Sequence, residues 1–195
     1  DTTAKRATKG VGFAWGVAEE VGKNIRLLEM FGLPGLKNLN IYFKNIKQKE
    51  FKNLTLITKE NISKIPYCPI IAGTSFLDQI NSTNEQKEIK IENMGFPILF
   101  LPFLSRASEI IGKRIFVNID DKDFLLNFNQ SIYSNYFSGD ILEKGNSIKI
   151  KFLENINSFT EKDWQELYKL SENTFVEETE ELKKSSAGAG LTDND

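Results

Sequence analysis

A helical face near the start of the chain has the residue types that acid–base chemistry needs. Trp15, Glu19, Gly22 and Arg26 are spaced 4, 3 and 4 residues apart, which places them along one side of a helix. Glu20 adds a second carboxylate. A carboxylate pair can supply a general acid and a general base when one pKa is raised. We therefore take Glu19 and Glu20 as candidate catalytic residues, and Trp15 and Arg26 as candidate ligand-binding residues.

The same face also has a purely structural explanation. Glycine inside a helix costs about 1 kcal/mol relative to alanine, so Gly22 indicates that a helix, a strand or a ligand comes close there. A helix crossing at Gly22, with Trp15 as a half-buried anchor, explains the pattern as well as a site does. Glu19 and Lys23 can also form an exposed pair at i, i+4. Both readings stay open.

The C-terminal tail presents a second cluster of oxygen ligands. Gly188 and Gly190 let the backbone pass close to a surface. Asp193 and Asp195 are further candidate catalytic residues, and Asn194 is a candidate ligand-binding residue. These oxygens can bind a hard cation, accept hydrogen bonds from Arg or Lys, or close a pocket. A tail docked only for structural reasons is the alternative, and we assign no residue to a metal site.

Two further polar groups are candidates to line a pocket with the first helix and the tail. The candidates are Thr74, Ser75 and Asp78 in the first group and Ser105, Arg106 and Glu109 in the second. A pocket built this way would hold a small polar metabolite. The sequence assigns no cofactor.

Composition excludes several kinds of chemistry. The 195-residue chain has no histidine, which removes the commonest general base and the usual Ser-His and Cys-His nucleophile pairs. Its single cysteine, Cys68, cannot form an intramolecular disulfide and fits a reducing compartment. The longest apolar stretch, 96–104, is interrupted by two prolines and is too short to cross a bilayer. We expect a cytoplasmic protein that does not bind membranes.

Charge is divided unevenly along the chain. Residues 1–153 have 21 Lys and Arg against 16 Asp and Glu, whereas residues 154–195 have 4 against 11. The acidic arm is therefore expected to lie on the basic body or on a neighbouring copy, and a homodimer is one such arrangement. The lysine-rich stretch 37–64 has few interleaved aromatic residues and no motif, so we expect no nucleic-acid partner.

Hydrophobic periodicity predicts an order of helices and strands. The expected helices are 2–9, 14–31, 67–78, 105–112 and 160–173. The expected strands are 39–43, 54–58, 88–93, 97–104, 114–119, 124–128, 131–137 and 147–152. Gly32-Leu-Pro-Gly35 is expected to end the first long helix, and Thr160 with Asp163 is expected to form a capping box.

These elements predict an α+β fold. We expect one domain, 1–195, with a mixed β-sheet covered by a long N-terminal helix and a C-terminal helix. The N-terminal helices occupy 1–32, and the ordered tail 183–195 docks on the body or on a neighbour. The passage 97–119 reads as strand, helix and strand, which suggests a crossover connection. Turns are expected at Ser138-Gly-Asp and Lys144-Gly-Asn, with pairing between strands 131–137 and 147–152.

Four segments resemble a known family. They are Gly-Phe-Ala-Trp-Gly-Val-Ala-Glu-Glu-Val-Gly at 12–22, Cys-Pro-Ile-Ile-Ala-Gly-Thr at 68–74, Pro-Ile-Leu-Phe-Leu-Pro-Phe-Leu at 97–104 and Gly-Ala-Gly-Leu-Thr-Asp-Asn-Asp at 188–195. The resemblance is to a domain of unknown function found in bacteria, largely in marine and other alphaproteobacteria, and it extends over the whole chain. It implies a single-domain protein to which the tail belongs, and it implies no catalytic residue.

Two functional readings follow from the residues. In the first, the protein binds a small polar metabolite or is a histidine-free enzyme that uses carboxylates. In the second, it is a non-catalytic oligomer subunit or interaction module whose acidic C-terminal tail docks into a partner. The sequence leaves open whether the protein is an enzyme.

Overall fold

The computed structural model describes residues 1–136 and 139–174. Contacts divide the chain into two units, Asp1–Asn155 and Ile156–Asp195. The first unit combines helices with a six-stranded mixed sheet, so the α+β prediction is confirmed. No helix among these described residues is long and apolar enough to cross a membrane.

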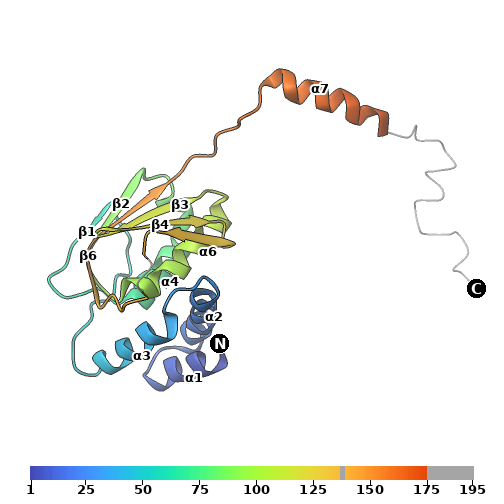
Figure 1. The fold of residues 1–195 in the computed structure, drawn as a ribbon. Coiled ribbons are helices and arrows are strands. Elements are labelled where there is room, and N and C mark those ends of the chain that lie inside the picture. The colour runs from blue at the N-terminus through green and yellow to red at the C-terminus, as the bar shows by residue number, and fades with distance from the viewer. Residues whose placement is uncertain (137–138, 175–195) are drawn as a thin grey trace, which may run out of the picture. The chain divides into compact units, whose positions relative to one another are not determined.

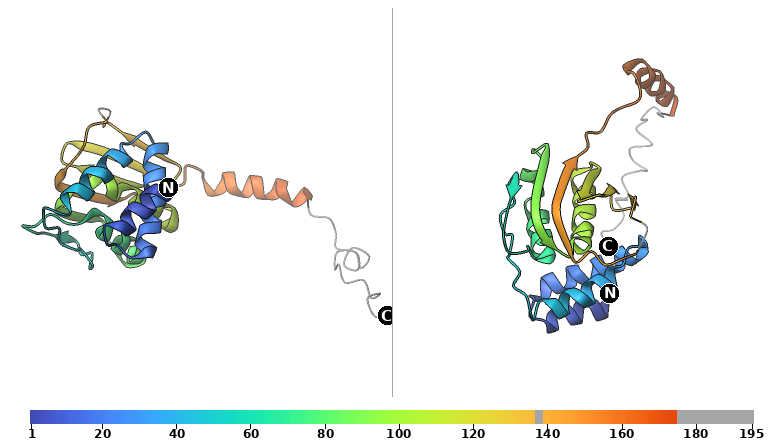
Figure 2. Two further views of the ribbon diagram at one scale, coloured as in Figure 1. Left: turned by 90° about the horizontal axis from the view of Figure 1, so that it is seen from below. Right: turned by 60° about the vertical axis from the view of Figure 1, so that its left-hand side comes forward.

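Three helices open the first unit and lie together in the views of Figures 1 and 2. They are α1 (Thr2–Gly10), α2 (Trp15–Met30) and α3 (Gly35–Asn45). The first two agree with the predicted helices 2–9 and 14–31. Gly32 adopts φ +72° just after α2, which is the left-handed conformation that ends a helix and that glycine adopts at low cost.

The prediction of a strand at 39–43 is wrong, because this segment lies inside α3. The residues of α3 that are buried are Gly35, Asn38, Leu39 and Tyr42, which is the i, i+3, i+4, i+7 recurrence of a helix. The β propensity of the Ile-Tyr-Phe run is overridden because only a helix buries all of these positions on one side.

The second helical layer is built from α4 (Pro69–Asp78), the short α5 (Ile80–Thr83) and α6 (Leu101–Ile111). The helix predicted at 67–78 is confirmed, with Pro69 in its first turn where a missing N–H has no cost. Gly112, at φ +63°, ends α6 as predicted. Gly73 of α4 faces the ring of Phe103 of α6, so the two helices meet at a position without a side chain.

The sheet has the strand order β1-β2-β6-β3-β4-β5, in which only β1 and β2 are parallel neighbours. The strands are β1 (Glu60–Asn61), β2 (Glu88–Gly95), β3 (Ile115–Ile119), β4 (Lys122–Asn127), β5 (Ser131–Ser134) and β6 (Lys144–Phe152). Alternate residues of β2, β3 and β6 are buried, and α6 packs on β3 and β4. The long helix α2 packs on α1, α3 and α6.

The strand predicted at 97–104 is wrong. Phe96 has φ 47°, after which Pro97–Phe100 forms a 3-10 turn that leads into α6. Both prolines of the segment lie in first turns, where they are tolerated. The segment is apolar throughout because it is buried all round, and periodicity cannot distinguish a buried strand from a buried helix.

The predicted strand–helix–strand crossover is present, but its first strand is β2 and not 97–104. β2 leads through α6 to β3, and β6 lies antiparallel between the two strands. β2 and β3 are therefore parallel but separated by one strand.

The predicted pairing of 131–137 with 147–152 is wrong, since β5 pairs with β4. The predicted turn at Lys144 is also wrong, because that residue begins β6.

The segment 54–58 is not a strand, because a side chain takes the place of a neighbouring backbone. The Gln79 amide donates to the Thr55 carbonyl at 2.8 Å, and its oxygen accepts from the Ile57 N–H at 3.1 Å. Leu54 and Ile57 are buried, whereas Leu56 between them is exposed, so burial in this segment does not follow the alternation of a strand.

The described part of the second unit contains α7 (Glu161–Ser171) and a short 3-10 turn, Glu172–Thr174. The predicted capping box is confirmed: Thr160 accepts from the Asp163 N–H at 3.2 Å, and the Asp163 carboxylate accepts from the Thr160 N–H at 2.8 Å. The rings of Phe159 and Trp164 lie 6.2 Å apart, which is the hydrophobic staple that often accompanies such a cap.

Candidate functional site

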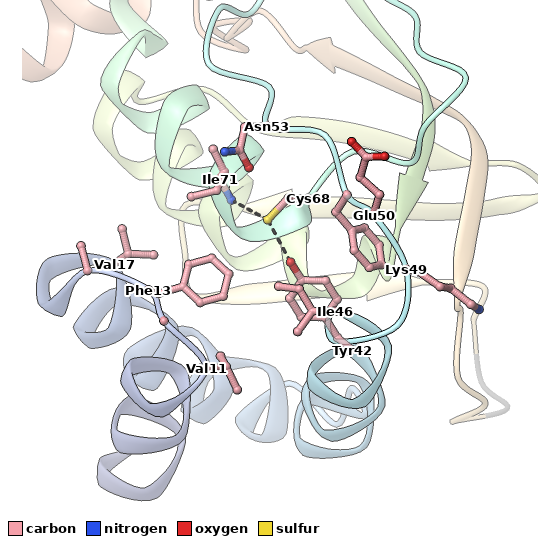
Figure 3. A pocket seen from close by; sticks show the side chains of 13 residues that line it. Val11, Phe13, Val17, Tyr42, Ile46, Lys49, Glu50, Asn53, Cys68 and Ile71 are labelled. Atoms are coloured by element: carbon pink, nitrogen blue, oxygen red, sulfur yellow. Dashed lines mark hydrogen bonds between the residues drawn. The ribbon is translucent and has the colours of Figure 1, made fainter.

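A cavity of about 480 Å³ lies in the first unit, where the loop between α1 and α2 meets α3 and the start of α4 (Figure 3). Its volume is in the range of small-ligand pockets, about 300–1,000 Å³. The lining residues are Val11, Gly12, Phe13, Ala14, Val17, Tyr42, Ile46, Lys49, Glu50, Phe51, Asn53, Cys68 and Ile71.

The local sequence explains why the loop between α1 and α2 opens this space. Gly12 has φ +109°, a conformation that side chains rarely adopt, and it turns the chain so that Phe13 lies against Phe43 of α3. Val17 follows one turn later on α2. These positions supply an apolar wall for the cavity.

Two buried polar groups lie at the floor. The Tyr42 hydroxyl and the Cys68 sulfur are 3.0 Å apart, and the Ile71 N–H donates to the same sulfur at 3.4 Å. Cys68 is therefore the N-cap of α4. A sulfur atom accepts hydrogen bonds weakly, so the cap leaves much of the partial positive charge of the helix start uncompensated.

Aromatic neighbours hold Tyr42 in place. Its ring lies 5.1 Å from that of Phe51 in an edge-to-face arrangement and 5.5 Å from that of Phe96. Tyr42 is fully buried and is one of the residues that line the cavity. The position of the hydroxyl is thus fixed before any ligand arrives, which favours affinity.

Burial keeps both floor groups protonated. It raises the pKa of the Cys68 thiol, against a smaller lowering by the hydrogen bonds from Tyr42 and the α4 backbone. It also raises the pKa of Tyr42, and the neighbouring sulfur raises it further. A thiol with a raised pKa is a poor nucleophile, so this pair is suited to hydrogen bonding and not to covalent catalysis.

The rim of the cavity is polar. Lys49, Glu50 and Asn53 line it and are exposed. In Figure 3 the side chains of Lys49 and Glu50 extend away from the Tyr42 hydroxyl. The rim thus adds charge of both signs at the mouth and none at the floor.

Trp15 and Glu19 share a separate groove between α1 and α2, also of about 480 Å³. Glu19 pairs with Lys5 at 3.6 Å and with Lys23 at 3.4 Å, and the Lys9 ammonium lies 5.6 Å from the centre of the Trp15 ring. The charge of Lys5, followed by Lys23, lowers the pKa of Glu19. A general acid needs the opposite shift.

Glu20 and Arg106 form an ion pair between α2 and α6, and Lys23 adds a contact to Glu20 at 3.3 Å. The structure thus brings two of the candidate residues together. Glu20 is held by two cations at about one-quarter exposure. This arrangement joins two helices, and it leaves the carboxylate fully engaged.

Gly22 is the point at which α1 crosses α2. A Cβ atom there would lie 2.8 Å from the Asp1 carboxylate and 3.1 Å from the Lys5 Cβ. The close approach expected at Gly22 is therefore made by a helix. Arg26 is exposed and borders a shallow hollow of about 160 Å³ with Met30.

The remaining candidates are dispersed. On α4 the Thr74 hydroxyl donates to the Ile71 carbonyl at 3.0 Å, Ser75 is half-buried and Asp78 is exposed. Glu109 accepts from the Asn129 amide at 3.1 Å, and Ser105 is buried. The tail candidates Asp193, Asn194 and Asp195 lie outside the described residues.

Sequence reasoning missed the floor of the cavity. Tyr42 was not among the predicted site residues, because the segment 39–43 was predicted as a strand. Its position next to the start of α4 depends on the helix α3 that forms instead. The signal for Cys68 was present: Pro69 at a first helical position marks the preceding residue as a cap. Across residues 1–136 and 139–174, no three His, Cys, Asp or Glu side chains gather as a metal-ligand group.

One family model matches the N-terminal part of the chain. Residues 1–68 match the family model described as "Protein of unknown function (DUF3726)". The match supports the resemblance to an uncharacterised domain family. It ends at Cys68, and it contains every cavity-lining residue except Ile71. No curated protein and no solved structure matches the chain significantly.

Proposed function

We propose that this protein binds a small metabolite in the cavity formed by the loop between α1 and α2, α3 and the start of α4. The observation that carries the proposal is the convergence of an apolar wall on a buried, rigidly held polar pair, Tyr42 and Cys68. Ligand pockets in proteins commonly combine a largely apolar lining with a few fixed polar groups.

The proposal favours binding over carboxylate catalysis. Of the two candidate carboxylates on α2, Glu19 has a lowered pKa, and Glu20 is paired with Arg106. A general acid near neutral pH requires a raised pKa, which is the opposite of the shift at Glu19.

The setting proposed for this activity is the bacterial cytoplasm. A single cysteine that stays a buried thiol supports a reducing compartment. The proposed partner is a small molecule, and neither nucleic acid nor a membrane forms part of the proposal.

A thermal-shift screen of a metabolite panel tests the binding proposal. A ligand that binds only the folded state at 100 times its Kd adds about 2.7 kcal/mol, which corresponds to about 5–10 °C for a chain of this size. Ala14→Trp should fill the mouth of the cavity and abolish the shift, because Ala14 is an exposed lining residue. Leu56→Trp is the matched control, since Leu56 is exposed and does not line the cavity. A shift that survives Ala14→Trp would contradict the proposal.

A second candidate function, partner docking, is supported by α7. Its apolar side chains Trp164, Leu167 and Tyr168 follow i, i+3, i+4 spacing and are at least half exposed. An amphipathic helix of this kind can bind in an apolar groove of another protein. Light scattering on the full chain and on a chain ending at Asn155 would measure whether the second unit changes the oligomeric state. If both chains have the same number of subunits in light scattering, the second unit does not mediate self-association.

A further inference from the structure

We propose that two copies of this chain pair through β5, so that their sheets join edge to edge about a two-fold axis at Tyr133. The surface shares no residue with the lining of the cavity, and the partner is a second copy of the chain.

The strand β5 has a free edge. It ends the strand order of the sheet, and among residues 1–136 and 139–174 only β4 pairs with it. The strand at the other end, β1, has only two residues, and a very short edge strand resists pairing with another chain. β5 instead lies inside the run from Phe124 to Gly139, which contains no charged residue and no proline. It therefore lacks the charges and prolines that usually protect a sheet edge.

The backbone of β5 directs hydrogen-bonding groups away from the sheet. In an antiparallel pair, residues that bond to the neighbouring strand alternate with residues whose groups point outward. The Asn135 N–H donates to the Asp123 carbonyl at 3.4 Å, so the odd-numbered residues of β5 are the ones that face β4. The N–H and C=O groups of Ile132 and Ser134 therefore point outward. Within the part of the chain that the structure describes, no other backbone or side-chain group bonds to them.

These outward groups are complementary to themselves under a two-fold rotation. When Ile132 lies opposite Ser134 of an antiparallel second copy, the pair exchanges both of its N–H···O bonds. The rotation generates the same pair on the other side of the axis, so every outward group of the two residues is used. A shift of the register by two residues leaves some of these groups unpaired. Tyr133 then lies on the axis, opposite the same residue of the second copy.

The side chains on one face of the sheet extend this match. Phe116, Leu125 and Tyr133 lie next to one another in register across β3, β4 and β5, and each is at least partly exposed. Tyr133, at the edge, is 61% exposed. In the dimer this row continues into the same row of the second copy, and the two tyrosine rings become a cross-strand aromatic pair, which stabilises a sheet.

The geometry also limits the size of the assembly. A two-fold pairing uses β5 of both copies and leaves only the short β1 at the outer edges, so the assembly closes at two chains. Two four-residue strands bury less area than the roughly 1,200 Å² at the lower end of standard interfaces. The dimer should therefore dissociate on dilution.

Cysteine cross-linking of the full chain tests the register. In a non-hydrogen-bonded antiparallel pair the Cα atoms are about 4.5 Å apart, which a disulfide can span. Tyr133→Cys should therefore form a covalent dimer when oxidised glutathione is added, and a non-reducing gel measures its yield. The native thiol, Cys68, is buried and should not react.

Asn135→Cys is the matched control for cross-linking, because Asn135 is exposed near the end of the same strand. In the proposed register it faces Ser131 of the second copy, so the two introduced thiols are about 14 Å apart and too distant for a disulfide. Its yield of covalent dimer should be at most about one-tenth of that of Tyr133→Cys.

Charge substitutions test the dimer without a covalent bond. Tyr133→Lys and Tyr133→Glu each place like charges opposite one another, so sedimentation should show monomers at concentrations at which the wild-type chain is dimeric. A mixture of the two variants should restore the dimer, because opposite charges then face each other across the axis. Leu56→Lys changes the charge of an exposed residue outside the sheet and should remain dimeric.

Four outcomes would overturn the proposal. The first is a wild-type chain that stays monomeric up to about 1 mM, where even a weak dimer of −4 kcal/mol is well populated. The second is a dimer that persists in both charge variants, which would place the contact elsewhere in the chain. The third is equal cross-linking of Tyr133→Cys and Asn135→Cys. The fourth is a mixture of the charge variants that stays monomeric, which would remove Tyr133 from the axis.

Discussion

The Tyr42 hydroxyl lies 3.0 Å from the Cys68 sulfur, so a residue from the middle of α3 contacts the residue that caps α4. This contact joins two residues that are 26 positions apart in the chain. It also forms the floor of the cavity. The same pair of atoms therefore contributes to the architecture and to the proposed site.

Alkaline pH should destabilise the protein through this pair. Burial raises the pKa of Cys68 in the folded state, so the folded protein keeps a proton that the unfolded chain loses. The stabilising contribution is complete below the ordinary thiol pKa of about 8.5 and is lost as the pH rises above it, by up to about 1.4 kcal/mol per pH unit. Urea denaturation between pH 7 and pH 10 measures this loss.

The matched variant for that experiment is Cys68→Ala. It should be less stable than the wild-type protein at pH 7, and the difference should shrink as the pH rises. Parallel stability curves for the two proteins would show that Cys68 does not titrate as its burial requires.

Gly73→Ala should destabilise the fold although alanine favours helices. A Cβ atom at Gly73 would overlap the ring of Phe103, which is buried at 1% exposure and cannot move aside. Overpacking of this kind costs about 1–3 kcal/mol. Chemical denaturation measures the loss.

Gly16→Ala is the control for that substitution. Gly16 lies on α2 with open space around its Cα, so alanine there should be neutral or stabilise by up to about 1 kcal/mol. The pair separates steric overlap from helix propensity. A neutral Gly73→Ala would mean that α4 and α6 do not meet as described.

The ion pair between Glu20 and Arg106 should affect stability and leave ligand binding intact. A double-mutant cycle with Glu20→Gln and Arg106→Met should give a coupling of about 0.5–1 kcal/mol, because the pair is only partly buried. The exposed pair of Glu19 and Lys23 should give a smaller coupling, because solvent screens it more. Loss of ligand binding in Glu20→Gln, with the fold preserved, would return this carboxylate to the list of catalytic candidates.

Thr160→Ala should fray the start of α7. The threonine side chain satisfies the Asp163 N–H, and loss of such a cap costs about 0.5–2 kcal/mol of helix stability. Amide hydrogen exchange of residues 161–165 in the full chain measures the fraying. Gln165→Ala, in the middle of the helix, should leave exchange unchanged.

The same cap predicts a response to acid. Hydrogen bonds from Thr160 lower the pKa of Asp163, so the contribution of the carboxylate is present at neutral pH. It is lost as the pH falls below the ordinary aspartate pKa of about 3.9. The protection of residues 161–165 against amide exchange, relative to the intrinsic rates at the same pH, should fall at acidic pH in the wild-type protein and change less in Asp163→Asn.

Local signals in the sequence were sufficient for several elements. The periodicity over 14–31 and the glycine at 32 defined α2, the proline at 69 defined the start of α4, and Thr160 with Asp163 defined that of α7. These three predictions were correct because helix ends and amphipathic faces depend on neighbours within a few residues. The absence of histidine likewise constrained the chemistry from composition alone.

Tertiary structure decided the remaining elements and the site. Residues 97–104 are apolar throughout, and burial on all sides, which only the folded core provides, makes them helical. The helical state of α3 follows from which of its faces is buried, and this in turn aligns Tyr42 with Cys68. The cavity arises from contacts between segments distant in sequence, and no local pattern records such contacts.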